Sequence, residues 1–569
     1  MIAEDLSFGD GADSDVCVIG AGPVGLAVAL TLARGGRRVL VLEAGGATAG
    51  SRSGGPFDLD VVNPATHGSG AMVSRQGLGG TATAWGGACT PMAEGDLAAW
   101  PRLSLPGAPA RFDELSGWHA AAGEILGVHG AFESQGPEDD HGAEVLTHQL
   151  IRHCRVADTA ALHHEEIARS PTLRISLDTR VSGLDFAPGS GAVTSLEVIR
   201  GTERHILRPK RIVLACGGVQ ATRLLLLIRR VHPGFLGGEG GPLGRYYMGH
   251  LSGAAARVQF RRPDMARHFL VRPTPDGASA RHSFVLAPWL RRREGLQDAY
   301  FALMNVPLDD PFYLSGALSA VHLALALRHR TPEYMLQYHP GHRITPFAFG
   351  LQARRHLGNV LCEPLATVAG LVRIARMRMA VQGRHPFFQF YNPHGVYALR
   401  YHAEQAPDPQ SRITLSARRD ADGVPLARVD LRFAAGDVDS VLRSHLALAS
   451  WMRASGLGEV TWHHPEPQRA AQVLAQASDG YHQIGSTRMS HSARTGVVDR
   501  NLRVHGVANL FVAGPSVLPA SGRFHPTFPA VALGVRLAHH LMAPAETRPR
   551  TRARRPAPVP MARGPAASG

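Results

Sequence analysis

The sequence predicts an α/β fold whose main sheet is parallel and is assembled from segments that lie far apart in the chain. Three observations indicate this fold. Short, continuous apolar runs at residues 16–19, 39–42, 211–216 and 509–514 are typical of strands buried on both faces of a parallel sheet. Glycine-containing turns and apolar repeats at helical spacing follow several of these runs. The chain has 569 residues, of which 44% are hydrophobic and 19% charged, so it can form more than one packed domain.

The first strand, turn and helix carry a nucleotide-binding pattern. Residues 20–25 have the form G-x-G-x-x-G, in which Gly20 makes the tight turn, Gly22 lets a pyrophosphate approach the backbone and Gly25 lets the helix pack against the strand. The phosphates would face the helix N-terminus. Glu43 follows the second strand, where an acid accepts hydrogen bonds from ribose hydroxyls, and an acid there disfavours NADP. The pattern predicts a dinucleotide without separating NAD from FAD, and a plain βαβ turn is the alternative.

A second glycine-rich stretch, residues 77–87, contains too many glycines for the interior of a stable helix or strand. It predicts a loop whose backbone lies against a flat ring or phosphates, and Trp85 in its middle favours a packed loop over a mobile one. The parallel sheet would combine the N-terminal, middle and C-terminal regions. Such a discontinuous domain is ordinary for flavoproteins and unusual for simple NAD dehydrogenases, which favours FAD.

Separate blocks along nearly the whole chain resemble the glucose–methanol–choline (GMC) oxidoreductases, FAD enzymes that oxidise alcohols and sugars. The blocks are residues 20–43, 79–87, 243–250, 404–415 and 481–527, of which the last is the most specific. The resemblance implies a discontinuous, Rossmann-like FAD-binding domain and a second α+β substrate domain on a mixed or antiparallel sheet. The expected bounds are 1–105, 165–250 and 476–543 for the FAD-binding domain, 106–164 and 251–475 for the substrate domain, and 544–569 for a disordered tail.

The resemblance also implies roles for two histidines. His482 would be the catalytic base beside the flavin N5, and His525, where relatives often have Asn, would be the second polar residue. An alcohol gives up a hydride only as its hydroxyl proton leaves, so a neutral imidazole is a fitting acceptor near neutral pH. The implied cofactor-binding residues are Gly20, Gly22, Gly25, Glu43, Gly79, Gly80, Thr81, Gly514, Pro526 and Thr527.

One departure from the family pattern concerns how FAD is held. Some members attach FAD covalently through a histidine just before the tryptophan of the glycine-rich loop. Here Ala84 stands at that position, and its methyl group cannot form the link. We therefore expect FAD to be bound non-covalently.

The resemblance favours oxidation of an alcohol or sugar CH–OH group but leaves alternatives open. The GMC family includes hydroxynitrile lyases, which keep the flavin and use the same pair of histidines without net redox change. A non-catalytic flavin-binding or membrane-associated protein is a third interpretation. The substrate, the electron acceptor (O₂, a quinone or another carrier) and the choice between oxidase and dehydrogenase are open at this stage, because the middle of the chain matches the family least.

Composition excludes several other classes. The net charge of +14 would suggest nucleic-acid binding, but the charge is partly local. Lys210 is the sole lysine, and residues 544–569 hold six arginines against one glutamate. Five cysteines without a C-x-x-C spacing predict neither a disulfide framework nor a zinc site, so we expect no metal.

The N-terminus lacks an apolar signal core, and the longest apolar run, 314–327, is too short to span a membrane. We therefore expect a cytoplasmic protein. Helices are predicted over 314–330 and 361–379. The second carries Arg373, Arg376 and Arg378, and we interpret it as a solvated face or lid while leaving peripheral membrane contact open.

Overall fold

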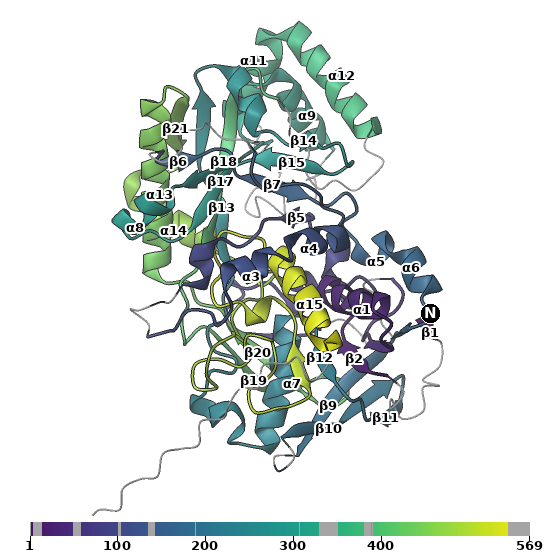
Figure 1. Ribbon diagram of the computed structural model, residues 1–569. Helices are drawn as coiled ribbons and strands as arrows, with labels where there is room; N and C mark the ends of the chain where they lie inside the picture. Colours follow the sequence, from purple (N-terminus) through teal and green to yellow (C-terminus); the bar gives the residue numbers. More distant parts are fainter. Residues whose placement is uncertain are drawn as a thin grey trace, which may run out of the picture.

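The computed structural model describes residues 2–3, 14–48, 58–98, 100, 104–134, 143–187, 189, 191–305, 308–328, 351–380, 389 and 391–543. Figure 1 shows a lower part built around a parallel sheet, an upper part built around an antiparallel sheet, and a group of helices at the top. The tail at 544–569 and most of the aromatic cluster at 385–391 lie outside the described residues. The predicted α/β class is confirmed.

The parallel sheet combines strands from three distant regions of the chain. Its order is β1 (Ile2–Ala3), β8 (Leu173–Ser176), β3 (Val39–Leu42), β2 (Val16–Ile19), β12 (Ile212–Leu214) and β22 (Leu510–Val512). All neighbouring pairs are parallel, with Cys17 opposite Ile212 and Ile212 opposite Leu510. The four strands predicted from apolar runs are therefore adjacent, and β8 adds a strand that the sequence analysis did not identify.

Helices cover this sheet at the points where its strands end. Helix α1 (Pro23–Arg34) follows β2, α7 (Gly218–Val231) follows β12, and α15 (Thr527–Met542) follows β22. The first and last lie against each other, and α4 (His119–Leu126) packs on α15 (Figure 1). Their apolar side chains and those of the sheet form one buried cluster, because both faces of a parallel sheet must be covered.

The second part is built on an antiparallel sheet, as predicted. Its order is β21 (Gly458–Trp462), β13 (His250–Phe260), β18 (Val396–Glu404), β17 (Ala299–Met304), β16 (Phe284–Leu286) and β6 (Val145–Leu146). Helices α13 (Ala435–Ala454) and α14 (Glu466–Gln476) pack on it and enclose a separate apolar cluster.

The apolar run at 413–415 does not belong to this antiparallel sheet. It belongs to β19 (Arg412–Arg419), which pairs with β20 (Pro425–Asp430) and, through it, with β4 (Asp60–Val61) in a small separate sheet. Ile413, Ala427 and Val429 are buried in the cluster of the parallel sheet. This segment therefore packs with the parallel sheet and not with the antiparallel sheet.

Smaller sheets complete the two halves. Strands β9 (Thr179–Ala187), β10 (Ala192–Arg200) and β11 (Glu203–Leu207) form an antiparallel sheet beside α7. Strands β5 (Ala88–Cys89), β7 (Leu150–His153), β15 (Ser279–His282) and β14 (Arg272–Pro273) form another. The second sheet joins segments from both halves, because β5 follows the glycine-rich loop and β15 precedes β16.

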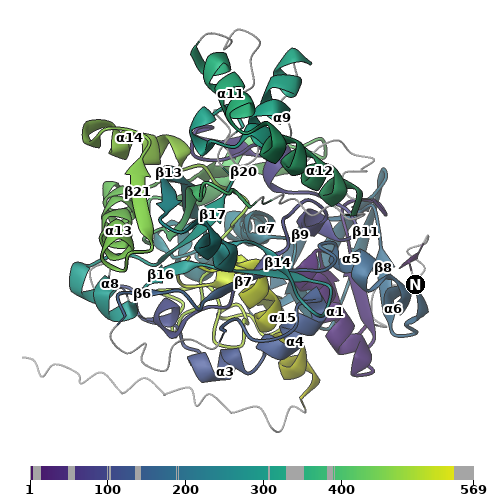
Figure 2. The same ribbon diagram turned by 90° about the horizontal axis from the view of Figure 1, so that it is seen from above.

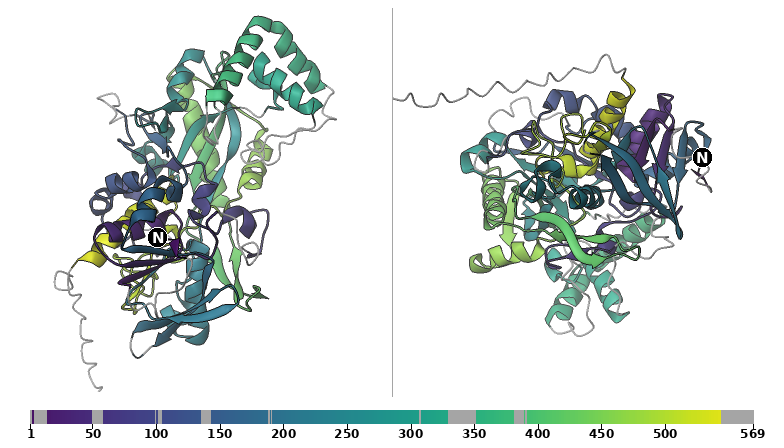
Figure 3. Two further views of the ribbon diagram at one scale, coloured as in Figure 1. Left: turned by 90° about the vertical axis from the view of Figure 1, so that its right-hand side faces the viewer. Right: turned by 90° about the horizontal axis from the view of Figure 1, so that it is seen from below.

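Three helices project from the antiparallel half (Figure 1; Figure 3, left). They are α9 (Gly316–Leu327), α11 (Leu351–Cys362) and α12 (Pro364–Ala380). The long helix predicted over 361–379 is in fact α12, with α11 ending at Cys362, because Pro364 starts a new helix more readily than it continues one. Among the described residues no single helix is long and apolar enough to cross a membrane.

Candidate active site

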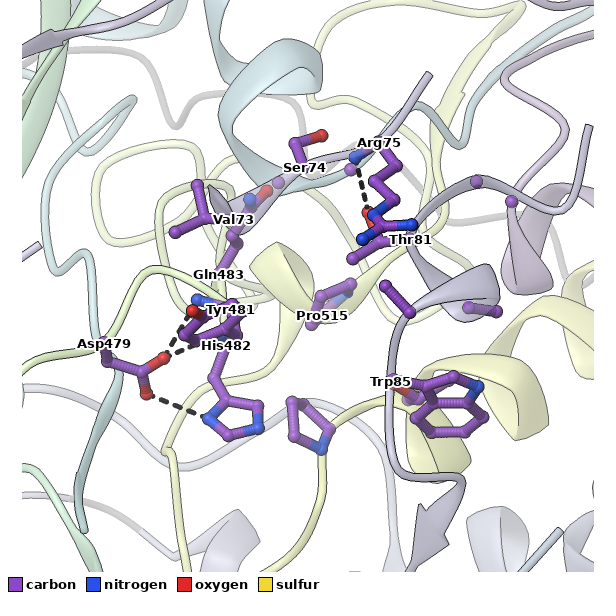
Figure 4. A pocket seen from close by; sticks show the side chains of 18 of the residues that line it. Val73, Ser74, Arg75, Thr81, Trp85, Asp479, Tyr481, His482, Gln483 and Pro515 are labelled. Carbon is purple, nitrogen blue, oxygen red and sulfur yellow. Dashed lines mark hydrogen bonds and ion pairs between the residues drawn. The ribbon is translucent and has the colours of Figure 1, made fainter. Parts of the chain in front are cut away.

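One cavity of about 940 Å³ connects the two regions that the sequence singles out. Gly20, Gly22 and Glu43 line it at the parallel sheet, and His482 and His525 line it at the boundary with the antiparallel half. Figure 4 shows this second region, with Thr81 and Trp85 of the glycine-rich loop on one side and His482 on the other. The fold therefore places a dinucleotide-binding pattern and a histidine pair on the same enclosed space.

The three glycines of the first turn have different surroundings. A Cβ atom at Gly20 would lie 2.7 Å from the carbonyl oxygen of Ala215, and one at Gly25 would overlap the carbonyl oxygen of Gly20. At Gly22 a Cβ would have no protein atom within 4 Å, and its φ of −75° is open to any residue. Contacts within the protein thus explain why glycine stands at positions 20 and 25. At position 22 no protein atom requires a glycine, and the position adjoins the open cavity.

Glu43 is buried at the end of β3 and accepts three backbone hydrogen bonds. The N–H of Ala21 donates to Oε2 at 2.8 Å, and those of Gly45 and Gly77 donate to Oε1, each at 2.9 Å. Burial raises the pKa of this carboxyl, and these donors counter part of the rise. Glu43 also lines the cavity, where its carboxylate oxygens can meet a ligand hydroxyl.

The glycine-rich loop is packed, as Trp85 suggested. The indole N–H of Trp85 donates to the carbonyl oxygen of Ala157 at 2.7 Å. The hydroxyl of Thr81 accepts from the backbone N–H of Arg75 at 3.1 Å (Figure 4). Residues Gly80–Thr83 form one 3-10 turn, where an irregular loop was expected. Ala84 lines the cavity and presents only a methyl group to it.

His482 is held by a buried carboxylate three residues before it. Its Nδ1 lies 2.9 Å from Oδ2 of Asp479, and its N–H donates a hydrogen bond to that oxygen (Figure 4). Oδ1 of Asp479 accepts the backbone N–H groups of Tyr481 and His482, and Oδ2 also accepts that of His250 at 2.7 Å. With Nδ1 protonated, the neutral ring keeps its lone pair at Nε2. His482 is therefore built to accept a proton from the cavity.

Burial would raise the pKa of Asp479, but His482, His250 and the donated hydrogen bonds lower it below its ordinary value. The carboxylate is therefore ionised across the neutral range. It is placed to balance the positive charge that His482 gains on protonation.

Two further histidines lie behind His482. The rings of His250 and His402 stack at 4.1 Å between centroids, and His402 stacks on His525 at 4.9 Å. Burial lowers the pKa of His250 to about 3, and burial with the neighbouring rings lowers that of His402 well below its ordinary value. These rings are neutral near pH 7, so they add no charge beside His482.

One nitrogen from each of His250, His402 and His482 lies within 4.8 Å of the others, a grouping able to hold a metal ion. Nδ1 of His250 and Nε2 of His402 are buried without a hydrogen-bond partner. The expectation of no metal thus stays a prediction.

His525 faces His482 across the cavity, with 6.1 Å between the ring centroids. Its Nε2 lies 3.1 Å from the hydroxyl of Tyr300, and its backbone N–H donates to the hydroxyl of Thr90 at 2.7 Å. Burial, followed by the charge of His482, lowers the pKa of His525 well below its ordinary value. A neutral His525 can donate a hydrogen bond to a group bound between the two rings, or accept one from it. It does not compete with His482 for the proton of that group.

The loop before His525 is held by a buried charged cluster. Arg523 bonds Asp298 at 2.7 Å, and Glu404 accepts the backbone N–H groups of Asp298 and Gly522. Burial and the nearby Asp96 raise the pKa of Glu404 to about 8. This cluster fixes the path of the chain into His525.

Most of the predicted site residues meet at the cavity. Those that line it are His482, His525, Gly20, Gly22, Glu43, Gly80, Thr81, Gly514, Pro526 and Thr527. Gly25 and Gly79 do not. Gly79 instead makes a left-handed turn (φ 88°) against the side chain of Asp158.

The sequence analysis missed Asp479, His402 and Tyr300, and it noted His250 only as part of a family block. The spacing of Asp479 from His482 offered a weak signal. His402 offered none, because only strand pairing brings β18 beside β13.

Comparison with known proteins identifies the C-terminal part of the chain. Residues 407–534 match the family model described as GMC oxidoreductase. This segment of the chain is therefore similar to the GMC oxidoreductases. It contains His482, His525, Asp479 and the start of α15.

A curated relative gives a second, shorter match. The fructose dehydrogenase large subunit of Gluconobacter japonicus is 31% identical over 150 residues, 26% of this chain. The match thus spans 25% of the length of that relative.

Two solved structures have the same fold. A formate oxidase matches with a TM-score of 0.53 and 15% identity, covering 94% of this chain and 98% of the other. An FAD-dependent oxidoreductase from Chaetomium thermophilum matches with a TM-score of 0.51 and 16% identity, covering 92% and 98%. At these identities the comparison concerns the fold alone.

Proposed function

We propose that this protein acts as a GMC oxidoreductase and oxidises the CH–OH group of an alcohol or sugar, with FAD as its hydride acceptor. One observation carries the proposal. A single cavity joins the nucleotide-binding turn at Gly22 and Glu43 to a histidine whose free ring nitrogen is fixed by a buried carboxylate. The first feature fits a dinucleotide, and the second fits removal of a hydroxyl proton.

The residues present fit FAD in three respects. Gly22 faces open cavity where a side chain would stand, the carboxylate of Glu43 lines the same cavity, and so do Gly80 and Thr81 of the glycine-rich loop. When bound, FAD supplies an electron-poor ring that accepts a hydride from the substrate carbon. Ala84 at the cavity wall supports non-covalent binding, which acid denaturation would test by releasing the flavin into the supernatant.

The chain's own residues would handle the proton. The substrate hydroxyl would bind between the rings of His482 and His525. Nε2 of His482 would take the hydroxyl proton, while Asp479 balances the resulting charge and keeps the ring oriented. His525, held by Tyr300, would hydrogen-bond the substrate oxygen and aim its carbon.

The test is anaerobic mixing of the purified protein with sugars, polyols and aliphatic, aryl and steroid alcohols. Loss of the visible absorption of oxidised flavin with at least one class is the expected result. Cyanide release from a cyanohydrin with unchanged flavin absorption would instead support the lyase alternative. Reoxidation of the reduced protein by O₂ or by a quinone would then identify the electron acceptor.

A further inference from the structure

The projecting helices have an inner face that is fully used for packing. Gly316 of α9 lies so close to α11 and α12 that a Cβ there would stand 2.7 Å from the carbonyl oxygen of Asn359 and overlap Thr367. A Cβ at Gly370 of α12 would lie 2.6 Å from that of Ala317. Close packing of small residues therefore joins α9, α11 and α12 into one unit, called here the projection.

The outer face of the projection is apolar and exposed. On α11, Leu357 and Leu361 are 47% and 74% exposed. On α12, Leu365, Val368 and Val372 are 86%, 60% and 45% exposed, and their spacing places them on one side of the helix. So many exposed leucines and valines on two adjoining helices are unusual on a protein that meets only water.

The apolar face carries almost no charge of its own. Between residues 357 and 372 the sole charged residue is Glu363, and its carboxylate pairs with His394 at 3.2 Å. Exposed arginines stand at both ends of this stretch: Arg354 and Arg355 before it, and Arg373 and Arg376 after it. The helices α11 and α12 contain no acidic residue within their bounds. The apolar face is therefore bordered by positive charge.

Shape limits how this face can meet a membrane. The two helices are bent by 99° at their junction, and neither is long enough to span a bilayer. Figure 2 shows α9, α11 and α12 extending beyond the rest of the molecule, so the face can meet a flat surface without obstruction by the sheets. A bent, uncharged face with flanking arginines suits the interface of an anionic bilayer, where apolar side chains reach the acyl chains and arginines reach the headgroups.

We propose that the projection docks the protein on an anionic membrane surface through the exposed leucines and valines of α11 and α12. The flanking arginines select anionic lipid, and the apolar residues supply the insertion. This inference does not depend on the proposed reaction, since it is measured without turnover.

The docking face adjoins the cavity. Phe312, which is 46% exposed, lies between the guanidinium groups of Arg257 on β13 and Arg355 on α11, 4.7 and 4.9 Å from its ring centre. Asp310, two residues earlier, lines the cavity. A molecule dissolved in the membrane would thus meet the protein beside the cavity wall.

The test is flotation of the full-length protein with vesicles of phosphatidylcholine alone or with added phosphatidylglycerol. We expect binding to the anionic vesicles. Replacing Leu361→Asp and Leu365→Asp together should weaken partitioning at least about tenfold, because two inserted leucines are lost. These side chains are exposed, so the fold should be retained, which flavin content and melting temperature would verify.

A matched control changes exposed leucines on another surface. Leu446 and Leu474, on α13 and α14, are 51% and 49% exposed. Leu446→Asp with Leu474→Asp should leave vesicle binding unchanged. Both variants keep the arginine-rich segment after residue 543, so a difference between them cannot come from that segment.

Charge is tested separately. Arg373→Glu with Arg376→Glu should lower binding to anionic vesicles and lower its sensitivity to salt. Equal binding by the wild type and the Leu361/Leu365 variant would overturn the proposal, as would absence of binding to anionic vesicles. A wild-type dimer in solution that this variant dissociates would assign the face to a second copy of the chain instead.

Discussion

The two ends of the cavity are built in different ways. At the parallel sheet the site consists of backbone from short continuous segments, residues 20–25 and 77–84, together with one carboxylate. At the antiparallel half it consists of side chains from β13, β17, β18 and two C-terminal loops. The first end depends on the space that glycine leaves without a side chain. The second depends on how side chains from distant parts of the sequence orient one another. Substitutions should therefore separate cofactor binding from proton transfer.

The largest separation is expected at His482. His482→Ala should retain FAD and slow anaerobic reduction by substrate at least about 100-fold, because the general base is lost. Rapid-mixing absorbance under argon measures the rate. His491→Ala, an exposed histidine outside the cavity, is the control and should reduce at the wild-type rate. Unchanged reduction in His482→Ala would remove the assignment of this base.

Asp479→Asn should produce the next largest change. An amide can donate to Nδ1 and so favour the ring form that has lost its acceptor at Nε2, and we expect reduction to slow between about 10-fold and 100-fold. The same rapid-mixing measurement applies, and an unchanged rate would mean that Asp479 does not orient the ring of His482.

Gly22→Val tests the other end of the cavity. A Cβ atom at this position meets no protein atom within 4 Å and the backbone angles are ordinary, so the apoprotein should melt near the wild-type temperature. FAD should bind about tenfold more weakly, because the side chain occupies the space of the pyrophosphate. Equilibrium dialysis measures the affinity. Gly436→Val on α13 is the control, since a Cβ atom added there also has no protein atom within 4 Å. Equal affinity would place the phosphates elsewhere.

The smallest effect concerns stability at the histidine end. Glu404 has a folded-state pKa of about 8, above its ordinary value of 4.5, so the folded protein holds this proton to a higher pH than the unfolded chain does. The contribution of Glu404 to the free energy of unfolding should therefore fall as pH rises through this window, by on the order of 1 kcal/mol or more. The lowered pKa values of His250, His402 and His525 act in the opposite direction, so urea titrations at pH 5 and pH 8 compare the wild type with Glu404→Gln. The change in stability from pH 5 to pH 8 should be more positive in Glu404→Gln, and an identical pH dependence in both proteins would contradict this account.

Sequence patterns predicted the parts of the molecule that depend on neighbouring residues. Strands β2 and β3, the turn at Gly20 and helix α1 could be predicted because each is determined by residues that are adjacent in the sequence. Asp479 and His402 could not be predicted in this way. Their roles arise from a loop carboxylate turned back onto His482 and from strand pairing between β13 and β18. The sequence showed that the helix predicted over 361–379 carries arginines. It could not show which side of α12 is exposed, because that depends on which side α9 covers.

The order of strands in the parallel sheet affects how the protein is made. Strand β22 pairs with β12, which pairs with β2, so the sheet joins the beginning, middle and end of the chain. A ribosome must synthesise nearly all of the chain before β22 can cover the edge of β12. Until then the nascent chain presents an unpaired, apolar strand edge, a state that is prone to aggregation. The nucleotide-binding half is therefore completed after translation, and a chain that stops before residue 510 would expose β12 permanently.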